Sequence, residues 1–396
     1  MKVLIKGPVQ TGGGDQYRLL SLCQVLSKYC DLILIKEEGV EDPELEKIFV
    51  RIYSFNLLSK VKVFNSTLST ILPDLNPDYH LSILRILEQE KPDICQITYP
   101  QGILSAKLAI KIKRTGQILI YDAHNVEADR THLYSTYSSL FTRYFRACLA
   151  KVYVPLCETI AVKLADHIIT ISNADKKRFI EKYRILEEKV SVVPMGIFLP
   201  DIKKLEFFRT FYRRKYLNNL PYDKIVMFHG LYRPATKNTI DIIINKIAPK
   251  VKNALFLIVG RNMPKFKYGN VLSIGYVKDL YSIFAAADIG IVPLAIGTKG
   301  GVRTKILDYM ACCKPVIATK EAIEGIELEN NKHAIIVESF DERFIKAINY
   351  LLENEDESKR IGKNARKFVE DKHDVEKIGK NLYSLYKRLL ESQRDK

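Results

Sequence analysis

A glycine-rich loop in the second half of the chain combines the residue types that hold phosphate groups. It spans residues 297–305, follows an apolar run and opens a short amphipathic helix. Glycines let the backbone approach a ligand, and a helix start offers free N–H groups and a positive dipole end. Arg303 and Lys305 add full charges, and an arginine can grip a phosphate through two parallel hydrogen bonds. Asp308, one turn into the helix, is placed to accept a hydrogen bond from a sugar hydroxyl.

Other turns of the second half also place a glycine at the end of an apolar run, near a cation or a suitable backbone group. These turns hold Gly230 with Arg233 and Lys237, Gly260 with Arg261, and Gly275 with Val277. The two cations after Gly230 suit a diphosphate, and the backbone near Val277 suits a nucleobase edge. Each turn alone is also consistent with solvated cations, which are common in so basic a chain. Together the turns predict one ligand-binding edge of a single sheet.

The first half carries a triple glycine, residues 12–14, directly before Asp15. It resembles a dinucleotide fingerprint but fails it, because Tyr17 occupies the third glycine position, where close helix–sheet packing needs a small residue. A nicotinamide cofactor is therefore disfavoured. We interpret Gly13 and Gly14 as lining a cleft toward the second domain, and the alternative is a flexible loop without a ligand.

A histidine follows the apolar run Ile118–Tyr121 within a cluster of polar side chains. Ligands of open α/β sheets sit beyond the carboxyl ends of the strands, which is where His124 would lie. Its imidazole suits proton transfer or a hydrogen bond to a sugar. A loop histidine satisfied by the backbone is an equally good interpretation of the residue types alone.

Short, continuously apolar runs alternate with helical patterns from end to end, which predicts parallel strands buried on both faces. The expected strands are Val3–Ile5, Asp31–Ile35, Ile94–Ile97, Ile118–Tyr121, Ile168–Ile171, Val190–Val193, Ile225–Phe228, Leu255–Val259, Val271–Ile274, Ile289–Val292, Val316–Ala318 and Ala334–Val337. This alternation is the signature of a doubly wound α/β fold. A break near Pro194–Pro200 divides the chain into Rossmann-like domains at about 1–196 and 197–375, and a final helix within 376–396 is expected to return to the first domain.

The composition is that of a soluble globular protein, with 396 residues, a mean hydropathy of -0.08 and a formal net charge of +16. Such a charge favours polyanions, whether nucleic acid, anionic lipid or phosphorylated ligands. The 7 cysteines form no disulfide or zinc framework. We find neither a signal peptide nor a run of the ~20 apolar residues that span a bilayer, and we expect a cytoplasmic protein.

Two aromatic and basic stretches, Phe141–Arg146 and Phe207–Tyr216, are candidates for contact with an anionic membrane surface. Cations attract anionic headgroups, and aromatic rings suit the interface. The alternative, slightly favoured for each stretch alone, is a helix with an aromatic core face and a solvated cationic face. No RNA-binding module is visible, so no nucleic-acid partner is expected.

Four segments together resemble the retaining, nucleotide-sugar-dependent glycosyltransferases of GT-B architecture, in particular family 4. They are residues 121–127, 165–172, 190–197 and 287–325, and the resemblance covers nearly the whole chain. It implies two Rossmann-like domains that face each other across a cleft. The second domain would hold the donor nucleotide, and the acceptor would enter from the first.

The resemblance also implies roles for individual residues of the second domain. Asp308 matches the acid that usually binds the ribose, whereas Gly300 stands where the family has an acid that contacts the donor sugar. The positions that meet the diphosphate are matched by Val302, Arg303 and Thr304, and Lys305 adds charge. The departure at Gly300 leaves the donor sugar open.

In the first domain, Gly13 and Gly14 match the family's glycine loop. Asp15 becomes a candidate for binding or deprotonating the acceptor, and His124 matches a residue that contacts the donor sugar or assists the acceptor. The implied reaction moves a sugar from a UDP- or GDP-linked donor to a hydroxyl, with retention. It needs neither a cofactor nor a metal, and no Asp-x-Asp motif is present.

The acceptor implied by the basic surface is a lipid-linked or surface glycan at the cytoplasmic face of the membrane, and other acceptors stay open. Rival hypotheses are another GT-B enzyme, such as a nucleotide-sugar epimerase or a pyridoxal-phosphate phosphorylase. A catalytically degenerate nucleotide-sugar-binding protein is a third, because Gly300 replaces an acid.

Overall fold

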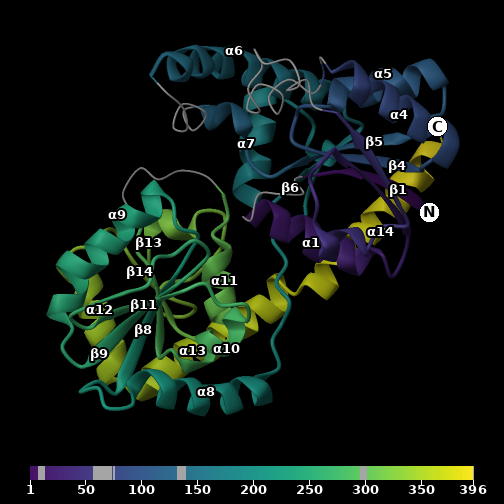
Figure 1. The fold of residues 1–396 in the computed structure, drawn as a ribbon. Coiled ribbons are helices and arrows are strands. Elements are labelled where there is room, and N and C mark those ends of the chain that lie inside the picture. The colour runs from purple at the N-terminus through teal and green to yellow at the C-terminus, as the bar shows by residue number, and fades with distance from the viewer. Residues whose placement is uncertain (8–13, 57–73, 75, 132–139, 295–300, 396) are drawn as a thin grey trace. The chain divides into compact units, whose positions relative to one another are not determined.

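The computed structural model of the chain describes residues 1–7, 14–56, 74, 76–131, 140–294 and 301–395, without the side chains of 140–149, 234 and 235. It divides into two compact units. Unit 1 comprises Met1–Gly196 and Val375–Lys396, and unit 2 comprises Ile197–Asp374 (Figure 1). The candidate residues of the first half and of the second half therefore belong to different units, and each unit is described by itself.

Unit 1 is built on a seven-stranded parallel sheet in the order β3-β2-β1-β4-β5-β6-β7. The strands are β1 (Lys2–Lys6), β2 (Asp31–Glu37), β3 (Arg51–Phe55), β4 (Ile94–Thr98), β5 (Ile118–Ala123), β6 (His167–Thr170) and β7 (Val190–Val192). The central strands β4 and β5 are buried at every residue, which explains why most of their residues are apolar. Their polar members are Gln96, Thr98 and Asp122. The strand order reverses beside β1, at the switch point where ligands of such sheets bind.

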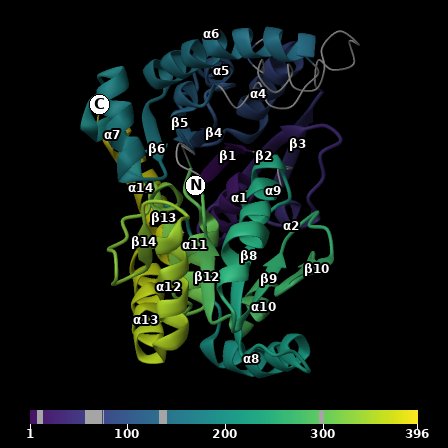
Figure 2. The ribbon, with the colours of Figure 1, turned by 90° about the vertical axis from the view of Figure 1, so that its left-hand side faces the viewer.

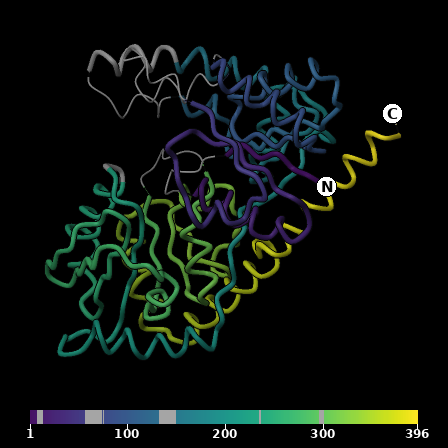
Figure 3. The backbone as a smooth tube through the Cα atoms, turned by 45° about the vertical axis from the view of Figure 1, so that its right-hand side comes forward, coloured from purple at the N-terminus to yellow at the C-terminus, as the bar shows by residue number. Residues whose placement is uncertain are grey.

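The helices of unit 1 are α1 (Gly14–Leu26), α2 (Pro43–Glu46), α4 (Pro77–Glu90), α5 (Ile103–Lys113), α6 (Leu140–Leu164), α7 (Asn173–Tyr183) and α14 (Val375–Arg394). The last of them comes from the end of the chain and packs on α1 (Figure 3). A Cβ on Gly379 would lie 2.4 Å from a methyl carbon of Val25, so only glycine permits this approach of α14.

Unit 2 has a second seven-stranded sheet, in the order β10-β11-β9-β8-β12-β13-β14. The strands are β8 (Lys224–His229), β9 (Ala254–Val259), β10 (Phe266–Tyr268), β11 (Val271–Gly275), β12 (Ile289–Val292), β13 (Val316–Thr319) and β14 (Ile335–Val337). All pairs are parallel except β10 with β11. The order reverses at β8, between β9 and β12, which places the expected ligand edge at the end of β8.

The helices of unit 2 are α8 (Ile202–Leu217), α9 (Pro234–Ile242), α10 (Leu280–Ala286), α11 (Thr304–Ala311), α12 (Glu342–Glu353) and α13 (Glu355–Lys372). Helices α12 and α13 lie side by side in Figure 2, and α8 packs on α10. The faces of α12 and the sheet share one apolar core, which includes Phe256, Ile289 and Phe344.

Every strand predicted from an apolar run is present, to within about two residues at each end, and the doubly wound α/β class is confirmed. Two strands were missed, β3 and β10. Both lie at sheet edges and expose most of their residues, so neither carries the continuous apolar run on which the prediction depended.

Candidate active site

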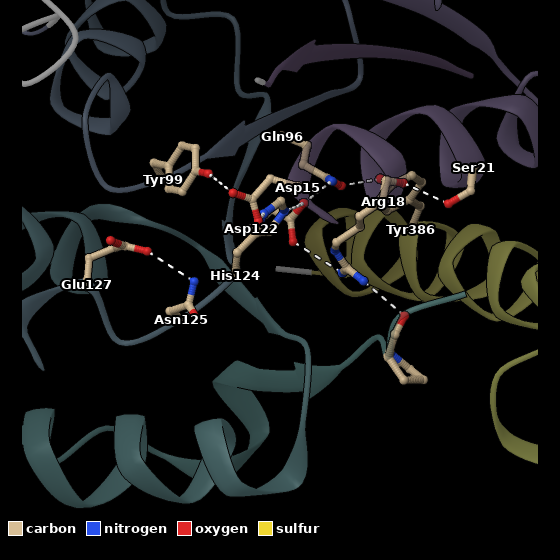
Figure 4. A network of polar contacts seen from close by, with 11 residues as sticks. Asp15, Arg18, Ser21, Gln96, Tyr99, Asp122, His124, Asn125, Glu127 and Tyr386 are labelled. Atoms are coloured by element: carbon tan, nitrogen blue, oxygen red, sulfur yellow. Dashed lines mark hydrogen bonds and ion pairs between the residues drawn. The ribbon is translucent and has the colours of Figure 1, made fainter. Parts of the chain in front are cut away.

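The carboxyl ends of β4 and β5 and the start of α1 bring Asp15 and His124 together in unit 1 (Figure 4). His124 Nδ1 lies 3.3 Å from Asp15 Oδ1, and its Nε2 lies 3.4 Å from Asp122 Oδ2. The Tyr99 hydroxyl donates to the other oxygen of Asp15 at 2.6 Å. Both ring nitrogens of His124 therefore face carboxylates, and Asp15 is held from two sides.

This arrangement fixes the charges of the pair. Burial alone would lower the pKa of His124, but the adjacent carboxylates, Asp122 first, raise it to about 9. Burial alone would raise the pKa of Asp122, but Arg18 and His124 lower it to about 2. In Asp15 the hydrogen bonds of His124 and Tyr99 likewise outweigh burial and lower its pKa. At neutral pH the structure thus holds an imidazolium between two carboxylates.

Of the two side chains, Asp15 and His124, only that of Asp15 is accessible to a ligand. The Asp15 side chain is 41% exposed, whereas that of His124 is 3% exposed. A charged, enclosed imidazolium is not a base at neutral pH. The geometry therefore favours a positioning role for His124, and it favours Asp15 as an ionised acceptor of hydrogen bonds.

The network continues behind Asp122 to the C-terminal helix. Gln96 Nε2 donates to Asp122 Oδ2 at 3.1 Å, and the Tyr386 hydroxyl on α14 donates to Gln96 Oε1. Arg18, one turn after Asp15 on α1, reaches Asp122 at 3.4 Å and the Pro194 carbonyl at 2.9 Å. The residue types alone did not indicate these partners. Gln96 could have been found as a polar residue inside the otherwise apolar run of β4. Tyr386 lies 290 positions from Gln96 in the sequence, and no sequence pattern indicated their contact.

A buried carboxylate fixes the loop that carries His124. Glu158 on α6 accepts hydrogen bonds from the Tyr121 and Tyr183 hydroxyls at 3.1 and 2.6 Å, and from the backbone N–H groups of Glu127 and Ala128 at 2.8 and 2.9 Å. Burial, with the charge of Glu158 adding, raises the pKa of Glu127 to about 7. The loop after β5 is thereby tied to α6 and α7.

In unit 2, the end of β8 and the start of α11 bring together Lys305, Asp308 and His229. The Lys305 ammonium lies 4.9 Å from the centre of the Phe228 ring. A Cβ on Gly230 would be 3.2 Å from the same ammonium, so the glycine leaves it room at the strand end. Asp308 lies 3.7 Å from His229 Nε2 and accepts from the Tyr281 hydroxyl at 3.2 Å. A cation and a carboxylate thus stand side by side at the switch point of the sheet.

The cation of this cluster is destabilised in the protein without a ligand. Burial, with the charge of Arg303 adding, lowers the pKa of Lys305 to about 8. Burial also lowers the pKa of His229, so its imidazole is neutral at pH 7. An anion bound beside Lys305 would restore the stability of its charge. Arg303 precedes Thr304, the first residue of α11, so both cations belong to the end of the helix where its free N–H groups lie.

The other predicted donor residues are distributed along this edge. A Cβ on Gly260 would lie 1.8 Å from the Gly230 carbonyl, so the ends of β8 and β9 meet only because this residue is glycine. Arg261 follows it and accepts a backbone hydrogen bond from Tyr232 at 3.0 Å. The remaining candidates, Arg233 and Lys237 at the start of α9 and Val277 after β11, are exposed or half-buried. Their roles stay predictions.

Some predicted residues lie outside the described part of the chain. Gly13 and Gly300 fall in the undescribed segments, and Gly14 begins α1. Val302 is described and half-buried in the loop before α11. Among the described residues, no group of three or more His, Cys, Asp or Glu side chains could hold a metal ion. None of the described helices is long and apolar enough to cross a membrane.

Comparison with known proteins places both units. Residues 19–199 match the family described as Glycosyltransferase Family 4, and residues 223–354 match Glycosyl transferases group 1. No curated protein matches the chain by sequence.

Solved structures share the fold over nearly the full length of the chain. HepE of Anabaena, crystallised with UDP and glucose, is 16% identical with a TM-score of 0.65, over 97% of this chain and 98% of that one. A glycosyltransferase from Rickettsia africae is 20% identical with a TM-score of 0.68, over 98% of each chain. WaaG, described as a glycosyltransferase of lipopolysaccharide biosynthesis, is 15% identical with a TM-score of 0.66, over 98% and 99%. At these identities the likeness establishes the two-domain GT-B fold.

Proposed function

Because this chain belongs to the glycosyltransferases of family 4 and group 1, we propose that it moves a sugar from a UDP- or GDP-linked donor to a hydroxyl acceptor, with retention. The observation that carries the proposal is the cluster at the end of β8. Lys305 and Arg303 stand at the start of α11, and Asp308 stands one turn later. Cations and helix N–H groups suit a diphosphate, and a carboxylate suits a ribose hydroxyl. The UDP found with HepE supports a nucleotide donor.

The residues of the cluster would act on the leaving group. As the bond from the anomeric carbon to the diphosphate oxygen breaks, negative charge grows on the diphosphate, and preorganised cations and N–H groups stabilise it. The acceptor oxygen forms the new bond on the same face of the sugar. Its proton passes to the departing phosphate oxygen. In this proposal no metal takes part, because Arg303 and Lys305 supply the positive charge.

Unit 1 would hold the acceptor. Asp15 is ionised and partly exposed, so it can accept a hydrogen bond from the acceptor hydroxyl and orient its oxygen. His124, charged and enclosed, would keep Asp15 in place rather than remove the proton. This division of roles differs from proton transfer by His124, which the residue types alone had left open.

The experiment that tests the proposal screens the protein against UDP- and GDP-linked sugars. Thermal shift identifies the donor, and sugar release is then measured with and without hydroxyl acceptors. We expect transfer to exceed hydrolysis at least tenfold once a suitable acceptor is present. Donor hydrolysis that proceeds equally fast without acceptor would contradict it, conversion of the donor sugar would indicate an epimerase, and affinity without turnover on any acceptor would indicate a binding protein.

We further propose that the acceptor is lipid-linked and that α8 holds this cytoplasmic protein on the membrane. Its outer face carries Lys203, Phe207, Phe211 and Lys215 at intervals of four residues, so they form one stripe. The phenylalanines are 71% and 56% exposed. Two exposed aromatic rings with a lysine on either side suit contact with an anionic lipid surface. WaaG, which acts in lipopolysaccharide biosynthesis, supports such an acceptor. The side chains of the other aromatic–basic stretch, 141–146, lie outside the described ones.

Replacing Phe207 and Phe211 together by serine is expected to lower binding to vesicles of phosphatidylglycerol and phosphatidylcholine by about tenfold, since two apolar rings leave the interface. Sedimentation with the vesicles measures it. The matched control replaces Leu108 and Ile112 of α5, an exposed pair with the same spacing, 43% and 68% exposed. Equal binding of both variants, or equal binding to vesicles without anionic lipid, would refute the assignment of α8.

A further inference from the structure

A charged cavity lies in unit 2 at the amino ends of β8, β12 and β13, the sheet edge opposite to Lys305 and Asp308. Its volume is about 270 Å³. The positively charged residues of its wall are Arg209, Arg213, Lys224, Lys314 and Lys359. The wall holds two carboxylates, Asp288 and Glu355. The cavity is therefore strongly cationic, and it is separate from the donor cluster at the end of β8.

Both carboxylates of the wall are already paired. Asp288 accepts from Arg209 at 2.8 Å, from Arg213 at 2.6 Å and from the Ile225 N–H at 2.8 Å. Burial alone would raise its pKa, but these partners, Arg213 first, lower it. Glu355 lies 2.7 Å from Lys359. The excess positive charge of the wall is thus left to be balanced by something else.

The most enclosed of these cations is Lys314, which is 9% exposed. Its ammonium donates to the Ala285 carbonyl at 2.7 Å, which engages one of its three N–H groups. Burial and the charge of Arg209 lower its pKa to about 8. A buried ammonium next to a guanidinium is costly, and the nearby carboxylate of Asp288 already binds two guanidinium groups.

Part of this charge has a structural use. Arg209, Arg213 and Lys314 donate to the carbonyls of Ala285, Ala286 and Ala287 at the end of α10. Cations at a helix C-terminus are stabilising. Lys224, however, is partly buried at the start of β8 and makes none of these bonds in the described structure. Capping of α10 therefore does not account for the whole cluster.

We propose that this cavity is a second ligand site, which binds the phosphate group of a small phosphorylated molecule. Lys224 and Lys314 would hold the phosphate oxygens, and Ser358 would donate a further hydrogen bond. The carbon skeleton would lie against the apolar part of the wall, which Pro315, Leu351 and Leu352 supply. The ligand class follows from the positive excess, and a cavity of about 270 Å³, slightly below the usual range of ligand pockets, restricts the ligand to a small molecule. The site is independent of the transferase activity proposed above.

The test measures binding of inorganic phosphate and of glucose 6-phosphate by calorimetry at constant ionic strength. All proteins carry Lys305→Met, so that phosphate in the donor cluster does not contribute. Lys224→Gln and Lys314→Met are each compared with Lys267→Gln, which removes an exposed charge on β10, three strands from β8. We expect saturable binding that either cavity variant weakens at least tenfold and Lys267→Gln leaves unchanged.

Hydrogen exchange of residues 351–359 gives a second readout, because Lys314→Met removes a bond to α10 and can destabilise the unit. Glucose 6-phosphate should slow exchange there in the Lys305→Met protein and not in its Lys224→Gln derivative. Binding unaffected by Lys224→Gln would overturn the proposal. The proposal would also be overturned if sodium chloride produced the same calorimetric heat and the same slowing of hydrogen exchange. In that case the cations would have only the role of capping α10.

Discussion

Replacing Lys305 with methionine is expected to weaken donor-nucleotide binding by about 10- to 100-fold and to lower turnover at least as much. A hydrogen bond to a charged group contributes roughly 1.5–3 kcal/mol, and each 1.4 kcal/mol is tenfold. Methionine keeps an apolar chain beside Phe228, so the loss reports the ammonium rather than the packing. Calorimetry with UDP and steady-state transfer rates measure the two effects.

The charge state of Lys305 adds a signature that general damage to the fold would not produce. Burial and Arg303 lower its pKa to about 8, and a bound phosphate should raise it again. Binding near pH 8.5 is therefore expected to take up a proton, so the observed heat should depend on the ionisation enthalpy of the buffer. In Lys305→Met this dependence should vanish.

Two companion variants sharpen the result. Lys252→Met changes an exposed lysine before β9 and should leave affinity and rate unchanged. Asp308→Ala should weaken UDP but not pyrophosphate, since a ribose contact is lost, whereas Lys305→Met should weaken both. If Lys305→Met binds UDP as tightly as the parent protein, the donor does not lie at the start of α11.

The sequence predicted the two sheets well because their central strands are buried on both faces. A strand such as β9, buried at every residue, is continuously apolar, and such a run is readily recognised in the sequence. The edge strand β3 has three of its five residues exposed, so the sheet constrains its composition little. Its position is determined by its pairing with β2, which is a tertiary contact that the local sequence does not encode.

The positions of the candidate residues at strand ends could be predicted one by one, whereas the network that joins them could not. Asp15 and His124 were each placed at a strand end, yet they are 109 positions apart, and their contact depends on β1 and β5 both flanking β4. The charge of His124 could not be predicted either. It is set by Asp122 and Asp15 on opposite ring nitrogens, and no sequence pattern carries that geometry.

The imidazolium of His124 is expected to stabilise unit 1 at neutral pH and to lose this effect in alkali. Its pKa is raised to about 9, against about 6.5 in an unfolded chain. A raised folded-state pKa gives stability that is fully present below the unfolded pKa and is lost as the pH rises through the folded one. One pKa unit corresponds to about 1.4 kcal/mol. Near pH 6 the free energy of unfolding of the protein should therefore exceed that of His124→Gln by roughly 3 kcal/mol, and this difference should shrink as the pH rises from about 6.5 to 9.

Scanning calorimetry of both proteins at several pH values resolves the difference, and the titration of the His124 ring by NMR gives its pKa directly. His167 is the matched control, because burial lowers its pKa to about 4. Folded and unfolded states both hold that ring neutral above pH 7, so His167→Gln should change stability by a constant amount from pH 7 to 9. Two results together would contradict the prediction: a stability difference between the protein and His124→Gln that does not change with pH, and a His124 ring that titrates near pH 6.5. They would mean that Asp15 and Asp122 do not hold the His124 ring in its charged form. Asp15 would then be free to act as a stronger base than its present contacts allow.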